Sequence, residues 1–183
     1  PGGIWLVAGP PKIGKSDLLM NLFTHAAAGI DFLWFRFLRT LRIFYIQAEI
    51  EKPYLYERYS NIANQNKELF EKGKNNLVIT AKFNFQFDEE GLKSIVDAIN
   101  SAFPNENGPI DIIAIDPFRN VYTSGLTQKG DLNEELIAFF HKRLEVILTK
   151  TYPQAGMIII HHTNKITARM LEEDPFSAVS GGC

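Results

Sequence analysis

Residues 9–16 read GPPKIGKS, and the rest of the sequence is best understood outward from them. They match the pattern G-x-x-x-x-G-K-[ST], with Gly9, Gly14, Lys15 and Ser16 at its specified positions. In such a loop the backbone N–H groups point inward and bind an anion, and glycine lets the backbone approach phosphate oxygens closely. A helix that starts directly after the loop adds its positive N-terminal end. The stretch therefore predicts a phosphate-binding loop.

The segments on either side of the loop support this prediction. An apolar run, IWLVAG (residues 4–9), precedes it, and DLLMNLFTHAAAG (residues 17–29) follows with the composition of a helix. A chance match in a helix-capping loop would seldom stand between a buried strand and a helix. In a genuine loop, Lys15 reaches the β- and γ-phosphates of ATP and the Ser16 hydroxyl ligates Mg²⁺. The residues predicted to bind the nucleotide are Gly9, Pro10, Pro11, Lys12, Ile13, Gly14, Lys15, Ser16 and Asp17.

Apolar, strand-like runs alternate with longer helix-like segments along the chain. The runs are rich in β-branched residues, which predicts strands buried on both faces of a parallel sheet. Alternation of this kind predicts an α/β fold with a central, mostly parallel sheet and helices on both of its faces. The predicted strands are 4–9, 43–49, 76–82, 110–116 and 156–162, the predicted helices 16–28, 54–71, 88–103 and 132–152, and the longest loops 84–87, 105–109 and 118–131.

Length and composition limit the classes of protein that need to be considered. With 183 residues and 45% hydrophobic residues, the chain is expected to form one globular domain. A formal net charge of −2 excludes a uniformly basic nucleic-acid-binding surface. Cys183 is the one cysteine, so no disulfide can form within the chain, which fits a reducing, cytoplasmic location. No apolar run has membrane-spanning length. Because the sequence starts at Pro1 within the approach to a strand, we expect residues 1–183 to be a single domain from a longer protein.

Acidic residues end two of the predicted strands. Asp116 closes IDIIAID (110–116), the position of a Walker B aspartate that holds magnesium directly or through water. Hydrolysis of ATP also needs a carboxylate that orients and deprotonates water. Residue 117 is proline, so this carboxylate has to come from another strand. Glu49, at the end of IFYIQAE (43–49), is the predicted base, and Glu51, two residues further into the loop, is the competitor.

Two adjacent histidines, His161 and His162, close the last predicted strand at the same sheet edge. A polar side chain in this position can contact the γ-phosphate and report its loss to neighbouring loops. Successive residues of a strand point to opposite faces, so one histidine is expected to face the nucleotide. A zinc site is disfavoured because no cysteine or other histidine stands at ligand spacing.

In this order, the four elements resemble the RecA-fold ATPase core of the RepA-like hexameric helicases, with the DnaB-like helicases and RecA-like recombinases as relatives. The most specific stretches are YIQAE, IDIIAIDPFRN and IIIHHTNK, and the resemblance runs from GGIWLVAGPPKIGKS to HHTNK. It implies a RecA-type sheet in which the last strand lies between the phosphate-loop and Walker B strands. It also implies Glu49 as catalytic base and His162, rather than His161, as the γ-phosphate contact. ATP would bind between the subunits of a homo-oligomeric, hexameric ring that acts on single-stranded DNA.

Two features of the sequence depart from this pattern. The arginine finger that a neighbouring subunit supplies in these families lies past the last strand, where only Lys165 and Arg169 are near. The segment FLWFRFLRTLRIFYI (32–46) is unusually aromatic and basic. Its arginines could contact DNA or a subunit, or form a solvated face, and Lys129 in the 118–131 loop could reach nucleic acid in a ring's channel. The arginines concerned are Arg36, Arg39 and Arg42.

The leading interpretation is a magnesium-dependent ATPase motor of a DNA helicase. A RecA-like recombinase or a KaiC-like regulatory ATPase would use the same core and differ in its flanking sequence. A small-molecule P-loop kinase would need an arginine-bearing lid, and none is evident. An inactive nucleotide-binding scaffold is disfavoured because Lys15, Ser16, Glu49 and Asp116 are all present.

Overall fold

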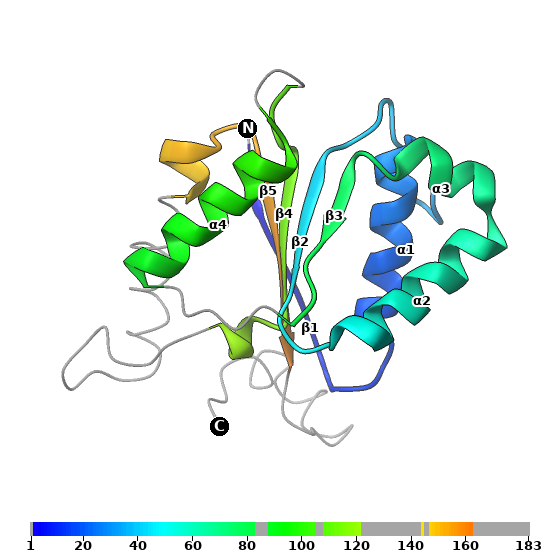
Figure 1. The fold of residues 1–183 in the computed structure, drawn as a ribbon, viewed down its shortest axis with the longest axis horizontal. Coiled ribbons are helices and arrows are strands. Elements are labelled where there is room, and N and C mark those ends of the chain that lie inside the picture. Colours follow the sequence, from blue (N-terminus) through cyan, green and yellow to red (C-terminus); the bar gives the residue numbers. More distant parts are fainter. Residues whose placement is uncertain (1, 83–87, 105–107, 122–143, 145–146, 163–183) are drawn as a thin grey trace, which may run out of the picture.

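Five parallel strands form one sheet in the order β1-β5-β4-β2-β3 (Figure 1). The computed structural model describes residues 2–82, 88–104, 108–121, 144 and 147–162. As expected, the last strand lies between the phosphate-loop strand and the strand that ends in Asp116. The strands are β1 (Ile4–Gly9), β2 (Ile43–Gln47), β3 (Leu77–Ile79), β4 (Ile112–Asp116) and β5 (Gly156–His162).

Helices cover both faces of the sheet, which confirms the predicted α/β architecture (Figure 1). One face carries α1, α2 and α3, and the other carries α4 and the short π-helical turn η4. None of the helices in the described part of the chain is both long enough and apolar enough to cross a membrane. Their bounds are α1 (Lys15–Ala28), α2 (Lys52–Gln65), α3 (Lys67–Gly73), α4 (Glu89–Ala102), η2 (Phe118–Asn120) and η4 (Ile147–Thr151).

Strand β2 separates two hydrophobic cores by the alternation of its side chains. Phe44 and Ile46 belong to the core beneath α4, whereas Ile43 and Tyr45 belong to the core beneath α1. Because side chains alternate with a period of two, Gln47 continues the α1 row. Since α1 follows the phosphate loop, the α1 face of the sheet is the face that carries the candidate site at its C-terminal edge.

Several details of the predicted elements are wrong. The strands predicted at 43–49 and 76–82 end early, β2 at Gln47 and β3 at Ile79, so Glu49 follows its strand rather than closing it. Strand β1 is not buried on both faces, since Ile4, Trp5 and Leu6 are 42–45% exposed. Among the described strands β1 lies at the sheet edge and pairs only with β5, so it has a neighbouring strand on one side alone. The predicted helix 54–71 is two helices, because Asn66 ends α2 and its side chain accepts a hydrogen bond from Leu69 N of α3 at 3.0 Å.

Other predicted segments fall partly or wholly outside the described residues. These are the loop at 84–87, most of the loop at 105–109, most of the loop at 118–131 with Lys129, and most of the helix predicted at 132–152. The candidate finger residues Lys165 and Arg169 also lie outside them. Phe118–Asn120, the start of the long loop, forms a short 3₁₀ helix, η2.

The arginines of segment 32–46 have partners within the chain. Arg39 forms two hydrogen bonds with the Asp111 carboxylate, at 2.5 and 2.9 Å. Arg42 stacks over the Phe103 ring at 4.7 Å and donates to the Gly108 carbonyl. These contacts lie where β2 and β4 begin, at the sheet edge opposite the phosphate loop. They favour a structural role for this pair of arginines over a nucleic-acid contact.

We predict that Asp111→Asn lowers the free energy of unfolding by about 1 kcal/mol at neutral pH. Burial alone would raise the pKa of Asp111, but the Arg39 side chain and the Arg42 N–H hold that pKa below its ordinary 3.8. The pair therefore stabilises the fold above pH 3.8 and loses this effect as the pH falls through the lowered pKa. Urea unfolding as a function of pH measures the free energy of unfolding of both proteins. The difference between the wild type and Asp111→Asn should become smaller in acid. Equal stability of the two proteins at neutral pH would contradict the prediction.

Candidate active site

A cleft of about 410 Å³ lies at the C-terminal edge of the sheet, between the phosphate loop and the ends of β2 and β5. Several predicted nucleotide contacts line it, from Pro11 to Asp17. Gly9 and Pro10 do not line the cleft but contact Lys15, and Ile13 is 61% exposed. The lining residues are Pro11, Lys12, Gly14, Lys15, Ser16, Asp17, Glu49, Ile50, Arg58 and His162.

The loop backbone has the conformation that an anion site requires. Gly14 is the N-cap of α1 with φ 88°, a left-handed conformation that favours glycine. It offers no side chain to the first amides of the helix, which leaves these N–H groups for a ligand. Lys12 also has a positive φ, 65°. A Cβ atom at Gly9 would lie 2.9 Å from Ile13 Cδ1, so the chain packs tightly where it enters the loop.

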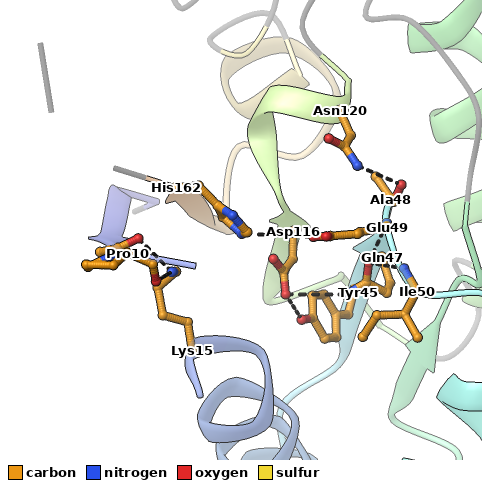
Figure 2. A network of polar contacts seen from close by, with 11 residues as sticks. Pro10, Lys15, Tyr45, Gln47, Ala48, Glu49, Ile50, Asp116, Asn120 and His162 are labelled. Atoms are coloured by element: carbon orange, nitrogen blue, oxygen red, sulfur yellow. Dashed lines mark hydrogen bonds and ion pairs between the residues drawn. The ribbon is translucent and has the colours of Figure 1, made fainter. Parts of the chain in front are cut away.

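The Lys15 ammonium group is folded back onto its own loop (Figure 2). Its Nζ donates to the carbonyl oxygens of Gly9 at 2.7 Å and Pro10 at 2.6 Å, and the residue is 9% exposed. Burial lowers the pKa of Lys15, and the negative charges of Asp116 and Glu49 oppose that shift. A phosphate that enters the cleft can therefore replace two neutral carbonyl partners with charged oxygens, which form stronger hydrogen bonds.

Asp116 lies at the end of β4 and is 1% exposed. One oxygen, Oδ2, accepts hydrogen bonds from the Tyr45 hydroxyl and from Gln47 Nε2, the latter at 3.4 Å (Figure 2). The other oxygen, Oδ1, is buried without a hydrogen-bond partner among the described residues. A buried carboxylate oxygen without a partner is costly, so this atom is suited to a cation or a cation-bound water.

A cation at this place would draw its ligands from several sources. Within the described residues, no group of three or more His, Cys, Asp and Glu side chains could hold a metal ion by itself. Mg²⁺ usually takes one or two protein groups together with waters and substrate phosphates. The Ser16 hydroxyl is suited to this role, since Ser16 lines the cleft and lies near Tyr45, which in turn contacts Asp116. The donor set of Ser16 and Asp116 therefore fits magnesium with a bound nucleotide.

Glu49 and His162 meet across the cleft (Figure 2). His162 Nε2 lies 4.0 Å from Glu49 Oε2, and their side chains are 23% and 58% exposed. By strand alternation, His162 shares the α1 face with Ile158 and Ile160, whereas His161 falls on the other face. Glu51, the alternative base, instead forms an ion pair with Lys82 at 3.1 Å. The geometry thus brings Glu49 and His162, rather than Glu51 and His161, to the loop.

Three polar residues of the site, and the cleft-lining Ile50, escaped the sequence analysis. Tyr45 and Gln47 are polar residues within a fully buried strand, and this pattern was visible in the sequence. The period-two alternation of the strand places both side chains on the α1 face. The Tyr45 ring packs edge-on against Phe23 of α1, with centroids 5.2 Å apart. Arg58 of α2 lines the cleft and forms an ion pair with Asp17 at 3.1 Å. No local pattern marks Arg58, because only the packing of α2 beside α1 brings it to the loop.

We predict that Tyr45→Phe lowers the free energy of unfolding by about 1.5–3 kcal/mol, the usual range for a hydrogen bond to a charged group. Burial, followed by the charge of Asp116, raises the pKa of Tyr45 well above its ordinary 10, so the phenol remains a donor at neutral pH. Chemical denaturation of the nucleotide-free chain measures the loss. Tyr54→Phe is the control, because Tyr54 is 63% exposed and should change stability by no more than about 0.5 kcal/mol. An equal loss of free energy of unfolding in the two variants would contradict a stabilising Tyr45–Asp116 hydrogen bond.

Comparison with known proteins agrees with this geometry. The sequence model of the AAA domain family AAA_25 matches residues 1–168. No curated protein matches the chain. The match covers every strand of the sheet and every lining residue of the cleft. The chain therefore belongs to the AAA domain family AAA_25 and is a P-loop, nucleotide-binding ATPase domain with a parallel α/β fold of RecA type.

Proposed function

We propose that this chain is the magnesium-dependent ATPase motor of a DNA helicase of the RepA or DnaB type, which works in the cytoplasm as a homo-oligomeric ring. The observation that carries the hydrolytic part is the convergence of Lys15, Glu49 and His162 on one cleft, beside the buried Asp116. Lys15 starts α1 directly after the phosphate loop, Glu49 follows the end of β2 by two residues, and His162 ends β5. Phosphoryl transfer to water needs a positively charged group, a carboxylate and a residue that contacts the γ-phosphate around one pocket. Lys15, Glu49 and His162 provide these three groups.

Each residue has one role in this proposal. The amides of residues 9–17 and the Lys15 ammonium bind the phosphates. Glu49 orients the attacking water and accepts its proton, and its exposed side chain has room to do so. His162 contacts the γ-phosphate, and its 4.0 Å separation from Glu49 lets loss of that phosphate change the environment of the carboxylate.

Ser16 and Asp116 would hold Mg²⁺ in this site. The Asp116 Oδ1 atom, buried without a partner among the described residues, supports this assignment. When bound, the ion neutralises negative charge on the β- and γ-phosphate oxygens. Tyr45 holds the second oxygen of Asp116, so the carboxylate keeps one orientation.

The helicase part of the proposal rests on the resemblance of the strand ends YIQAE and IIIHH to the RepA-like and DnaB-like families. In this arrangement a neighbouring subunit supplies an arginine finger, and single-stranded DNA is the second substrate. Charge supplied by the neighbour would stabilise the transition state, often the largest contribution to catalysis. A RecA-like recombinase or a KaiC-like regulatory ATPase is the alternative. Neither would unwind duplex DNA, and the regulatory ATPase also predicts hydrolysis that DNA does not change.

We predict that ATP hydrolysis by this chain is stimulated by single-stranded DNA and that Glu49→Gln lowers kcat by about 10²–10⁴-fold, the usual contribution of a general base. Glutamine retains the size of the side chain, so binding of ATP should persist. Steady-state phosphate release, with and without DNA, measures both effects. Glu51→Gln is the matched control, since Glu51 pairs with Lys82 and does not line the cleft.

The two halves of the proposal can fail separately. Equal activity of Glu49→Gln and the wild type would remove Glu49 as the base. Hydrolysis that DNA does not change would favour the regulatory ATPase over the helicase. Binding of ATP without turnover would call for the same assay with the arginine finger supplied, in the full-length protein.

We also predict that Arg58→Ala raises the KM for ATP about tenfold, which corresponds to about 1.4 kcal/mol of binding free energy. The guanidinium lines the cleft next to the loop and can exchange Asp17 for an anionic ligand. Arg36→Ala is the control, because Arg36 is 66% exposed and pairs with Asp31 outside the cleft. Kinetics at varied ATP concentration decide the matter, and a KM equal to that of the wild type would exclude Arg58 from nucleotide binding.

A further inference from the structure

Gln47 connects the two carboxylates of the candidate site. Strand register places Gln47 directly opposite Asp116, and the glutamine is 1% exposed. Its amide nitrogen Nε2 donates to Asp116 Oδ2 at 3.4 Å. Its amide oxygen Oε1 accepts from the backbone N–H of Glu49 at 2.7 Å and of Ile50 at 3.0 Å (Figure 2). One side chain thus contacts the predicted magnesium ligand and the backbone of the predicted base.

The chemistry of glutamine accounts for this arrangement. The amide carries a donor and an acceptor at the end of one side chain, and both are used here. Glutamate would keep the acceptor, lose the donor and place a second negative charge against Asp116. Methionine would fill the same volume with neither group. An apolar residue would serve a buried strand better if packing were the only requirement, because a buried amide is costly unless it is hydrogen-bonded.

Other contacts hold the turn after β2 but do not reach the Asp116 carboxylate. Ala48 N donates to the backbone oxygen of Asp116 at 2.7 Å, and Asn120 Nδ2 donates to Ala48 O at 3.2 Å. On the other side, Thr80 Oγ1 accepts from Gln47 N at 3.0 Å. These bonds fix the path of the backbone. Of the contacts that hold this turn within the described residues, the Gln47 side chain is the one that also reaches the Asp116 carboxylate.

We propose that Gln47 is a positioning residue that sets the Glu49 backbone relative to the Asp116 carboxylate. The Glu49 side chain is 58% exposed and needs an anchored backbone to return to one place over the γ-phosphate. Gln47 supplies this anchor on one end and orients the metal-side carboxylate on the other. This inference rests on the proposed ATPase function, and it assigns Gln47 no contact with ATP.

Gln47→Met provides the first test because it conserves side-chain volume and removes both polar groups. Loss of a partner of this kind typically costs about 10–100-fold in activity or metal affinity. We expect kcat to fall by this factor while the Kd for ATP changes less than about twofold. Thr80→Val, which removes the partner of the Gln47 backbone N–H and leaves the side-chain link intact, is the matched control and should retain the wild-type kcat.

A double-mutant cycle separates positioning from a general loss of structure. If Gln47 acts through Glu49, then at saturating Mg²⁺ Gln47→Met should cause no further loss in a Glu49→Gln background, measured by single-turnover hydrolysis of γ-labelled ATP. If Gln47 only supports the fold, the same loss should appear in both backgrounds. Additive losses would overturn the proposal.

Metal binding gives a readout that does not depend on turnover. Gln47→Asn keeps the amide group but is one methylene too short to reach both Asp116 and the turn, so it also covers the case in which Gln47→Met fails to fold. Titration of Mn²⁺ in the presence of ADP, followed by electron paramagnetic resonance, should show an affinity weakened about 10–100-fold. A wild-type affinity would overturn the proposal even if the protein binds ATP without hydrolysis. A wild-type chain that binds no nucleotide would overturn the proposed function, whereas hydrolysis by Gln47→Met at the wild-type rate would overturn this inference alone.

Discussion

The buried carboxylate of Asp116 is the constraint around which this molecule is organised. It lies 1% exposed at the end of a central strand, where an ionised group is costly unless it is paired. The Tyr45 hydroxyl and the Gln47 amide contact one of its oxygens, and the other has no partner among the described residues. The Lys15 ammonium, held by its own loop, supplies a nearby positive charge. The Asp116 Oδ1 atom thus still needs a positively charged partner, and a cation bound with a polyphosphate would provide one.

The parallel sheet brings these groups together through its register. Gln47 lies opposite Asp116, and β5 is inserted between β4 and the phosphate-loop strand β1. All five strands point the same way, so their polar C-terminal ends meet at one edge and the cleft lies there. The opposite edge carries the Arg39–Asp111 pair, which joins the segments that precede β2 and β4, and the Arg42–Phe103 stack, which joins the segment before β2 to the end of α4. The charged groups at the edge where the strands begin are therefore paired with each other, whereas those at the cleft can bind a ligand.

Much of the site could be predicted because its signals are local. The loop 9–16 has a fixed spacing, and Asp116, Glu49 and His162 each end an apolar run. The choice of Glu49 over Glu51 depended on distance from the strand end, and the structure places Glu51 with Lys82 instead. Arg58 could not be predicted, since it reaches the cleft through the packing of α2. The exposure of β1 was also hidden, because apolar composition does not tell an edge strand from a central one.

Residue spacing and periodicity were enough to predict the loop at 9–16, the succession of strands and helices along the chain, and the face to which each strand residue points. These properties depend on spacing and on the periods of strand and helix, which are written into neighbouring residues. The tertiary structure decided which strands are neighbours, and with that the Tyr45–Asp116 bond, the Gln47 bridge and the 4.0 Å approach of His162 to Glu49. The Tyr45–Asp116 and Gln47–Asp116 contacts join residues 71 and 69 positions apart along the chain, and Glu49 and His162 are further apart still, so no local pattern contains them.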